Sequence, residues 1–421
     1  MVIDLGELRD EPELPARPLS PWHRRALGGA VAMVALLASG GAAAPAQPPL
    51  VAQTIQATAA DEIVVESDAL YLMRPHRGVV RAGLRSVTRY RLPEAVREWE
   101  AELYTPGPVH AISIVDGILL AIADGPAVQT IAVRTDTGQE VWRRAGWWQR
   151  TAGGHALLFD HSRPERLQLF SVALETGDVR WSMMFAPDEP VYLDRGRFVH
   201  WRHTGHAFVY DEDTGELRAS AQVPAPDPEQ MGLVAGGLLL VPGRAAGGPV
   251  LTAYGLDRLD RRWTVELDLT VEYINDGCGD ALCVGRGDGV DGTRLIDIAT
   301  GRTRWSAPGW GYVYQVGPHL LAYGRTERDS SPRLAFLDPA DGRVIADFGE
   351  WTGSLAGDDG RMLAVRENGP RAIVARIDPL ALELRVLGVV DGVFQCQPGP
   401  LAVVCRKAGG SIGVWSPRRR L

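Results

Sequence analysis

Four cysteines carry most of the chemistry that this sequence could perform. They form two close pairs, Cys278 with Cys283 and Cys396 with Cys405. Such thiols form disulfides, bind zinc or stay buried and free. The long stretch of chain between the pairs disfavours one shared zinc site, whereas each pair brackets a segment that can fold as a hairpin and bring its ends together. We therefore predict two local disulfides in an oxidising compartment, with buried free thiols as the alternative.

Three histidines form the next group that could do chemistry. His200, His203 and His206 lie in the segment FVHWRHTGHAFVY, where a tight turn at Thr204-Gly205 would place His203 opposite His206. Two histidines make an incomplete metal site, and no precise third ligand is evident. An exposed polar hairpin is therefore the favoured interpretation.

Acidic residues and sequence motifs offer little more. Asp288 and Asp291 lie in the loop GRGDGVDG, residues 285–292, which lacks the regular acidic spacing of a calcium-binding hand, so a turn is favoured. We find no nucleophile elbow, phosphate-binding loop or zinc-protease motif. We therefore assign no catalytic residue and no metal ligand, expect no cofactor, and name no cofactor-binding residue.

The residues that recur do so with a regular spacing, which indicates a structural role. Three segments, Ile131–Trp142, Ser171–Trp181 and Leu295–Trp305, share Thr-Gly followed by Trp four residues after the Gly. Weaker copies extend the series, with tryptophan-equivalent positions at 99, 142, 181, 219, 263, 305, 346 and 386. The steps between these positions are 43, 39, 38, 44, 42, 41 and 40 residues. Five of the positions are tryptophan: Trp99, Trp142, Trp181, Trp263 and Trp305.

Each repeat unit also has the same succession of short apolar segments. In residues 110–146 the segments HAISIV, ILLAIA, TIAVRT and EVWRRA alternate with Asp- and Gly-containing turns. Four short antiparallel strands in a unit of this size are typical of a propeller blade. We predict an all-β fold over residues 61–416, an eight-bladed β-propeller with seven blades as the alternative, in which strands from the two chain ends can share one blade.

The pattern resembles the tryptophan-docking repeat of the PQQ-like, quinoprotein-type propellers. This family includes pyrroloquinoline-quinone dehydrogenases and the outer-membrane assembly protein BamB. We expect each tryptophan to lie on an outer strand and pack between blades. We expect the turn glycines to supply a positive φ angle: Gly138, Gly177, Gly215, Gly301 and Gly342. A quinone dehydrogenase would have a longer chain and a vicinal cysteine pair, so no cofactor residue is carried over.

The first sixty residues differ from the rest. No charged residue lies between Arg25 and Asp61, and Ala26–Ala46 is long enough to span a membrane as a helix. We predict a disordered cytoplasmic tail over residues 1–25, a transmembrane helix over 26–46 and a linker over 47–60, with a short basic tail at 417–421. Arg24 and Arg25 favour a cytoplasmic start. Cleavage of the segment as a signal, which would release a secreted protein, is the alternative.

These features together favour a binding protein. The net charge of -8 gives no footprint for nucleic acid. Trp147, Trp148 and Trp310 follow outer strands and could form an aromatic docking surface on the rim or pack between blades. We predict a membrane-anchored, extracytoplasmic, non-catalytic scaffold for a protein or cell-envelope partner. The alternatives are a PQQ-dependent dehydrogenase and a sensor that signals to the cytoplasmic tail.

Overall fold

The computed structural model describes residues 50–75, 83–151, 153–226, 232–286, 292–326, 329–351, 353–356, 362–368, 371–399 and 402–417. The predicted cytoplasmic tail, the hydrophobic segment 26–46 and residues 418–421 of the basic tail lie outside these ranges, as does most of the loop 285–292. Every regular element of the described part is a β-strand. Over the same residues, no helix is long and apolar enough to cross a membrane.

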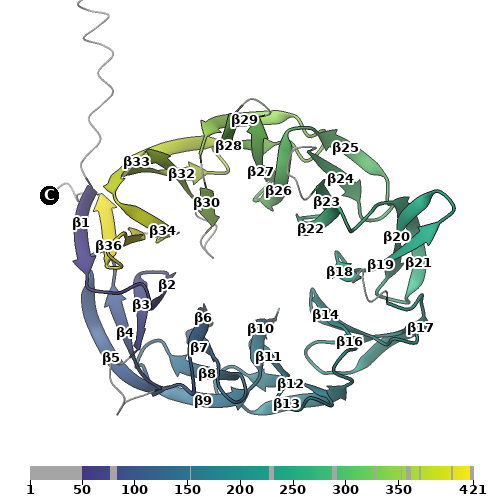
Figure 1. Ribbon diagram of the computed structural model, residues 1–421, viewed down its shortest axis with the longest axis horizontal. Helices are drawn as coiled ribbons and strands as arrows, with labels where there is room; N and C mark the ends of the chain where they lie inside the picture. Colours follow the sequence, from purple (N-terminus) through teal and green to yellow (C-terminus); the bar gives the residue numbers. More distant parts are fainter. Residues whose placement is uncertain are drawn as a thin grey trace, which may run out of the picture. The chain divides into compact units, whose positions relative to one another are not determined.

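The strands form nine four-stranded antiparallel sheets arranged as the blades of a ring (Figure 1). The first strand of each blade lies next to the centre of the ring and the fourth at its rim. Blades 1 to 3 consist of β2 (Glu62–Glu66), β3 (Ala69–Pro75), β4 (Leu84–Arg91) and β5 (Val96–Tyr104); β6 (Val109–Val115), β7 (Ile118–Ala123), β8 (Gln129–Arg134) and β9 (Glu140–Ala145); and β10 (Trp147–Arg150), β11 (His155–Asp160), β12 (Leu167–Ala173) and β13 (Val179–Phe185).

The next five blades continue the same order along the chain. Blades 4 to 6 consist of β14 (Val191–Asp194), β15 (Arg197–Trp201), β16 (His206–Asp211) and β17 (Leu217–Gln222); β18 (Leu233–Ala235), β19 (Leu238–Ala245), β20 (Gly248–Gly255) and β21 (Asp260–Glu266); and β22 (Glu272–Cys278), β23 (Ala281–Arg286), β24 (Thr293–Asp297) and β25 (Thr303–Ala307). Blades 7 and 8 consist of β26 (Trp310–Val316), β27 (His319–Thr326), β28 (Asp329–Leu337) and β29 (Val344–Glu350); and β30 (Gly353–Ala356), β31 (Met362–Asn368), β32 (Arg371–Asp378) and β33 (Glu383–Asp391).

The ninth blade joins the two ends of the repeat region, and it corrects the predicted blade number of eight. Its strands β34 (Val393–Pro398), β35 (Val403–Lys407) and β36 (Ile412–Pro417) are completed at the rim by β1 (Leu50–Ile55). β1 pairs with β36 from Leu50 opposite Pro417 to Ile55 opposite Ile412. The predicted linker 47–60 is therefore wrong for residues 50–55, which form a strand of the ring.

Buried polar contacts support this closure. Arg406 on β35 is 5% exposed and donates hydrogen bonds to the carbonyl oxygens of Thr58, at 2.7 Å, and Asp61, at 2.6 Å. The Asp61 carboxylate is buried as well, and it accepts hydrogen bonds from the backbone N–H and hydroxyl of Thr58. Arg74 of blade 1 lies 3.3 Å from the same carboxylate. These groups connect blade 9, the β1–β2 connection and blade 1.

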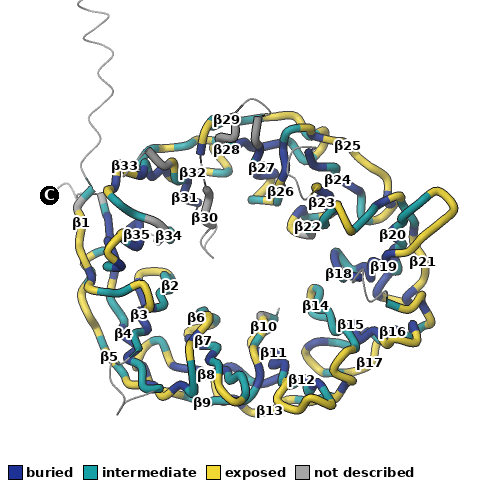
Figure 2. The backbone as a smooth tube through the Cα atoms, viewed as in Figure 1, coloured by how far each residue is buried: buried dark blue, intermediate teal, exposed yellow. Residues whose placement is uncertain are grey.

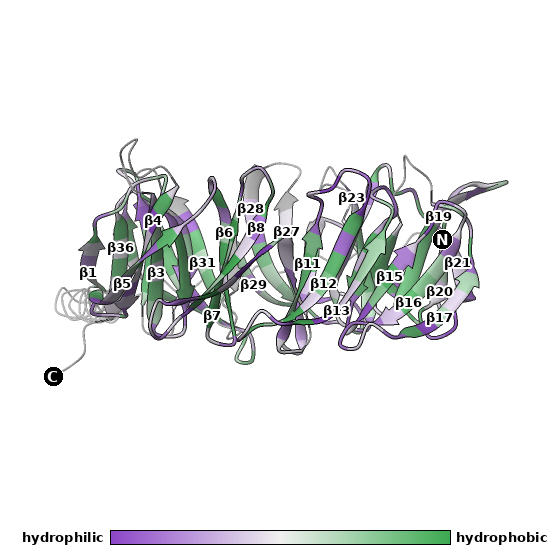
Figure 3. Cartoon of the chain, turned by 90° about the horizontal axis from the view of Figure 1, so that it is seen from below, coloured by the Kyte–Doolittle hydropathy of each residue, from purple (hydrophilic) through white to green (hydrophobic). Residues whose placement is uncertain are grey.

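The hydrophobic core is divided among the contacts between blades. Nine clusters of buried side chains lie one at each blade-to-blade interface of the described ring. The second strand of a blade is buried along most of its length, because Leu119 and Ala121 face the preceding blade while Ile118 and Leu120 face the following one. Two buried faces explain the continuous apolar runs of these strands. Figure 2 shows the burial, and Figure 3 shows apolar residues concentrated in the strands and polar residues at the turns.

Candidate functional site

The five tryptophans of the repeat contact the next blade in one shared way. Each indole Nε1 donates to the carbonyl oxygen three residues before a turn glycine of that blade, at distances of 2.7 to 3.1 Å. The acceptors are Thr135, Leu174, Glu212, Ile298 and Pro339. A Cβ atom added to any of the five glycines would lie within 3.0 Å of the indole carbons. The glycine therefore makes space for the tryptophan of the preceding blade.

The degenerate units separate this steric role from the predicted conformational one. The glycines have φ angles from 68° to 74°, but Ala95, Leu259 and Leu382 hold the same turn position at 53°, 55° and 56°. Leu259 packs with Ala219, and Leu382 with Ala346, at the positions where other blades carry tryptophan. Ala95 follows blade 9, whose rim strand is β1. Glycine therefore occurs where an indole must be accommodated, and positive φ alone does not require it.

Both predicted disulfides are confirmed. Cys278 and Cys283 join β22 to β23 with a Cα separation of 6.0 Å, and Cys396 and Cys405 join β34 to β35 at 4.0 Å. All four residues are buried at blade interfaces. The disulfides therefore fix the first hairpin of blades 6 and 9 and leave no thiol for chemistry in these residues.

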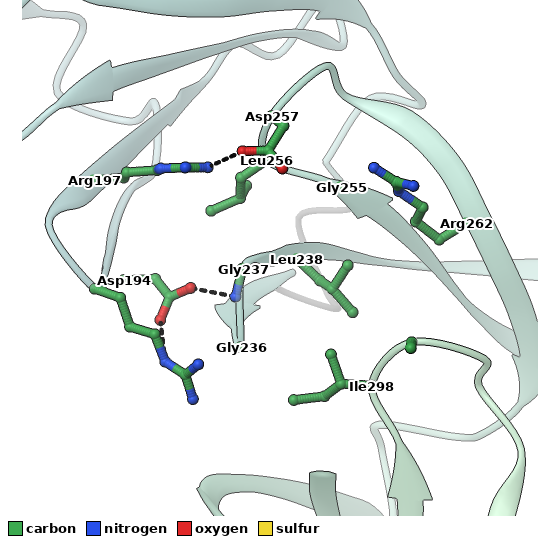
Figure 4. Close-up of a pocket in the computed structure, with 12 residues that line it drawn as sticks. Asp194, Arg197, Gly236, Gly237, Leu238, Gly255, Leu256, Asp257, Arg262 and Ile298 are labelled. Carbon is green, nitrogen blue, oxygen red and sulfur yellow. Dashed lines mark hydrogen bonds and ion pairs between the residues drawn. The ribbon is translucent and has the colours of Figure 1, made fainter. Parts of the chain in front are cut away.

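A polar pocket of about 410 Å³ lies among turns of blades 4, 5 and 6 (Figure 4). Its charged side chains are already engaged within the chain. Asp194 accepts a hydrogen bond from the backbone N–H of Gly237 at 2.5 Å, and Arg197 lies 2.7 Å from Asp257. Arg195 donates to the carbonyl oxygen of Gly279 at 3.0 Å. The first two contacts join blade 4 to blade 5 and the third joins blade 4 to blade 6, which is sufficient to explain the charges of these residues.

A larger hollow lies between blades 3 and 4, on the opposite side of the ring, which carries the turns between second and third strands. We call it the aromatic hollow; it has a volume of about 650 Å³ and apolar lining from Trp147, Phe159, Leu167, Pro187, Pro190 and Tyr192. The ring planes of Trp147 and Phe159 are stacked with centroids 4.6 Å apart. Burial raises the pKa of Tyr192 to about 12, so its hydroxyl stays protonated.

Carboxylates and histidines border this hollow. Asp188 and Glu189 come from the connection between β13 and β14, and His203 from the turn between β15 and β16. The Nε2 atom of His203 lies 3.0 Å from Asp188, and that of His200 lies 2.6 Å from Glu189. Burial lowers the pKa of His200 below its ordinary value of 6.5, against the opposing effect of Glu189. At neutral pH the buried His200 is therefore uncharged.

Glu189 also borders an adjoining hollow of about 640 Å³. Its other lining residues include Met183, Phe185, His200, Arg202 and Tyr210. The guanidinium of Arg202 lies over the ring of Phe208, 4.9 Å from its centroid. The two hollows share the Glu189 carboxylate, and the adjoining hollow also contains the guanidinium of Arg202.

The candidate residues of the sequence are distributed differently from expectation. Arg202, and not His203, is hydrogen-bonded across the turn to His206, so the three histidines do not converge. Among the described residues, no group of three His, Cys, Asp or Glu side chains could hold a metal ion. Trp147 and Trp310 begin the first strands of blades 3 and 7, next to the centre, so of the two alternatives predicted for them, a docking surface on the rim is wrong. Trp310 is buried between blades, whereas Trp147 opens onto the hollow.

One buried acid–histidine contact was not predicted. His155 on β11 is 2% exposed, and its Nδ1 lies 3.2 Å from Asp213 and its Nε2 3.8 Å from Glu212. Glu212 is 3% exposed at the position that Leu174 occupies in blade 3. Burial lowers the pKa of His155, although Asp213 opposes this shift. Blades 3 and 4 thus also meet through titratable groups on the other side of the ring.

The closed ring of nine four-stranded sheets and the indole contacts define the chain as a β-propeller built from tryptophan-docking repeats. No family model and no curated protein matches it. Among solved structures, BamB from Moraxella catarrhalis is similar at 13% identity, covering 87% of this chain and 100% of that one with a TM-score of 0.45. The computationally designed Ika8 protein is similar at 10% identity, covering 88% and 99% with a TM-score of 0.45. The fold assignment rests on the sheets, and similarities at this level say nothing of function.

Proposed function

We propose that this chain is a non-catalytic binding module: an extracytoplasmic β-propeller, anchored by residues 26–46, that holds a protein or cell-envelope partner. The observation that carries the proposal is the aromatic hollow between blades 3 and 4. Its Trp147 is 37% exposed, and exposed tryptophans beside apolar pockets are typical of binding hot spots. The two disulfides support an oxidising compartment outside the cytoplasm.

Site-specific photo-crosslinking tests the binding function. A benzophenone amino acid at position 147 of the full-length protein in native membranes should capture a discrete partner. Leu217 on the rim strand β17 is the matched control, because it is also exposed but lies away from the hollow. Equal, diffuse capture from both positions would contradict the proposal.

Whole-cell protease accessibility tests the topology. Cleavage of the propeller from outside, with the full-length mass retained in untreated cells, is expected for an anchored extracytoplasmic domain. A shortened mature protein would instead indicate a cleaved signal. Dye-linked oxidation of an alcohol after addition of PQQ and calcium would overturn the non-catalytic assignment.

A further inference from the structure

The aromatic hollow has the composition of a site for a cationic side chain. Trp147 stacks against Phe159 on one side and remains partly exposed, and Tyr192 lines the same space. Aromatic rings attract cations through their electron-rich faces, and tryptophan does so most strongly. The indole is held by its stacking partner before any ligand arrives, so little conformational freedom is lost on binding.

The charge of the hollow points the same way. Asp188 has a side chain that is 69% exposed and Glu189 one that is 15% exposed, and they are the acidic residues of the described lining. Within that described lining, none of the residues is an arginine or a lysine. Arg202 lies in the adjoining hollow over Phe208, and Arg166 is held near Glu165 and the Met184 sulfur. The lining therefore holds two carboxylates, which lie within 3.0 Å of His203 and His200, beside the partly exposed ring of Trp147.

We propose that this hollow binds an arginine side chain of the partner protein. This inference rests on the proposed binding function and specifies its chemistry. A planar guanidinium can stack on an indole and pair with a carboxylate at the same time.

The test uses peptides selected from a random display library on the full-length protein in lipid nanodiscs. Counter-selection against the variant D188N/E189Q removes sequences that bind elsewhere. We expect the remaining peptides to contain arginine. Replacing that arginine by citrulline, which has nearly the same shape without the charge, should weaken binding about 10-fold, as should D188N/E189Q. W147L should weaken binding about 3- to 10-fold.

A matched control separates local chemistry from net charge. D116N/E175Q removes two exposed carboxylates from turns on the opposite side of the ring and changes the net charge equally. This variant should bind the peptides as the native protein does. The inference is overturned if counter-selection leaves no arginine-containing peptides, if citrulline binds equally, or if the control variant weakens binding as much as D188N/E189Q.

The result is distinguishable from failure of the proposed function. A partner that is crosslinked through position 147 but binds D188N/E189Q normally would support the binding function and refute arginine recognition. Arginine-dependent peptide binding without any crosslinked protein in membranes would support the site and refute the protein partner.

Discussion

Replacing Gly301 tests why the repeat needs glycine. In G301A the new Cβ would lie 2.6 Å from the Trp263 ring, at a φ angle of 68°. A left-handed backbone costs an L-residue about 1–2 kcal/mol, and overpacking a filled interface costs about 1–3 kcal/mol. We expect G301A to lower the free energy of unfolding by about 2–5 kcal/mol. Gly196 has a φ angle of 82° with no atom within 4 Å of the added Cβ, so G196A should lose only about 1–2 kcal/mol.

A double-mutant cycle isolates the steric part. In the W263A background the indole is gone, and the pair then resembles Ala219 with Leu259. In that background G301A should lower the free energy of unfolding only by the cost of the left-handed backbone. The coupling energy between positions 263 and 301 should therefore be about 1–3 kcal/mol. Urea unfolding followed by far-ultraviolet circular dichroism measures all four proteins, and matching slopes permit the comparison. Equal losses for G301A and G196A, or additive effects of G301A and W263A, would refute the argument.

Three further perturbations have defined outcomes. R406M should lower the urea midpoint, because the carbonyl oxygens of Thr58 and Asp61 lose a buried donor, a loss of about 2–3 kcal/mol; the exposed R371M should change it little. C278S/C283S should cost about 2 kcal/mol for so short a loop, and a reductant should then have a smaller additional effect than on the native protein. Stability should fall as the pH drops below 6.5, since burial lowers the pKa of His155 and His200 and the unfolded chain then binds protons first. Urea midpoints at pH 7.5, 6.5 and 5.5 measure this slope, and H155Q/H200Q with an unchanged slope would contradict its origin.

The repeat could be found from sequence because the same spatial problem recurs at each blade interface. Its count of eight turns missed one blade for a topological reason. A turn between third and fourth strands marks each continuous blade, but blade 9 takes its fourth strand from the opposite end of the chain. A ring closed in this way has one more blade than it has turns between third and fourth strands. The strand β1 could not be recognised from the repeat either, because its sequence LVAQTI is not preceded by a turn of the repeat pattern.

The pairing of each tryptophan with the turn glycine of the next blade can be recognised from the sequence. Units that carry Ala95, Leu259 or Leu382 in place of glycine are those that no tryptophan precedes in the ring. The aromatic hollow could not be predicted from the sequence. Asp188 and Glu189 lie in an irregular connection, and their contacts with His203 and His200 depend on how two hairpins and a link are placed in space.

Residues that differ from the equivalent positions of the other blades indicate roles besides closure of the ring. Blades 3 and 4 depart from the repeat on both sides of the ring. On one side Glu212 replaces an apolar residue at a buried position and faces His155 from the preceding blade. On the other side Asp188, Glu189 and His203 border the partly exposed ring of Trp147. An ion-forming group at a buried interface costs stability unless it is paired. A leucine at position 212, as at position 174, would fill the same position without the cost of burying a carboxylate. If this cost exceeds what the contacts of Glu212 return, E212L should raise the free energy of unfolding; a destabilised E212L would show instead that the carboxylate stabilises the fold.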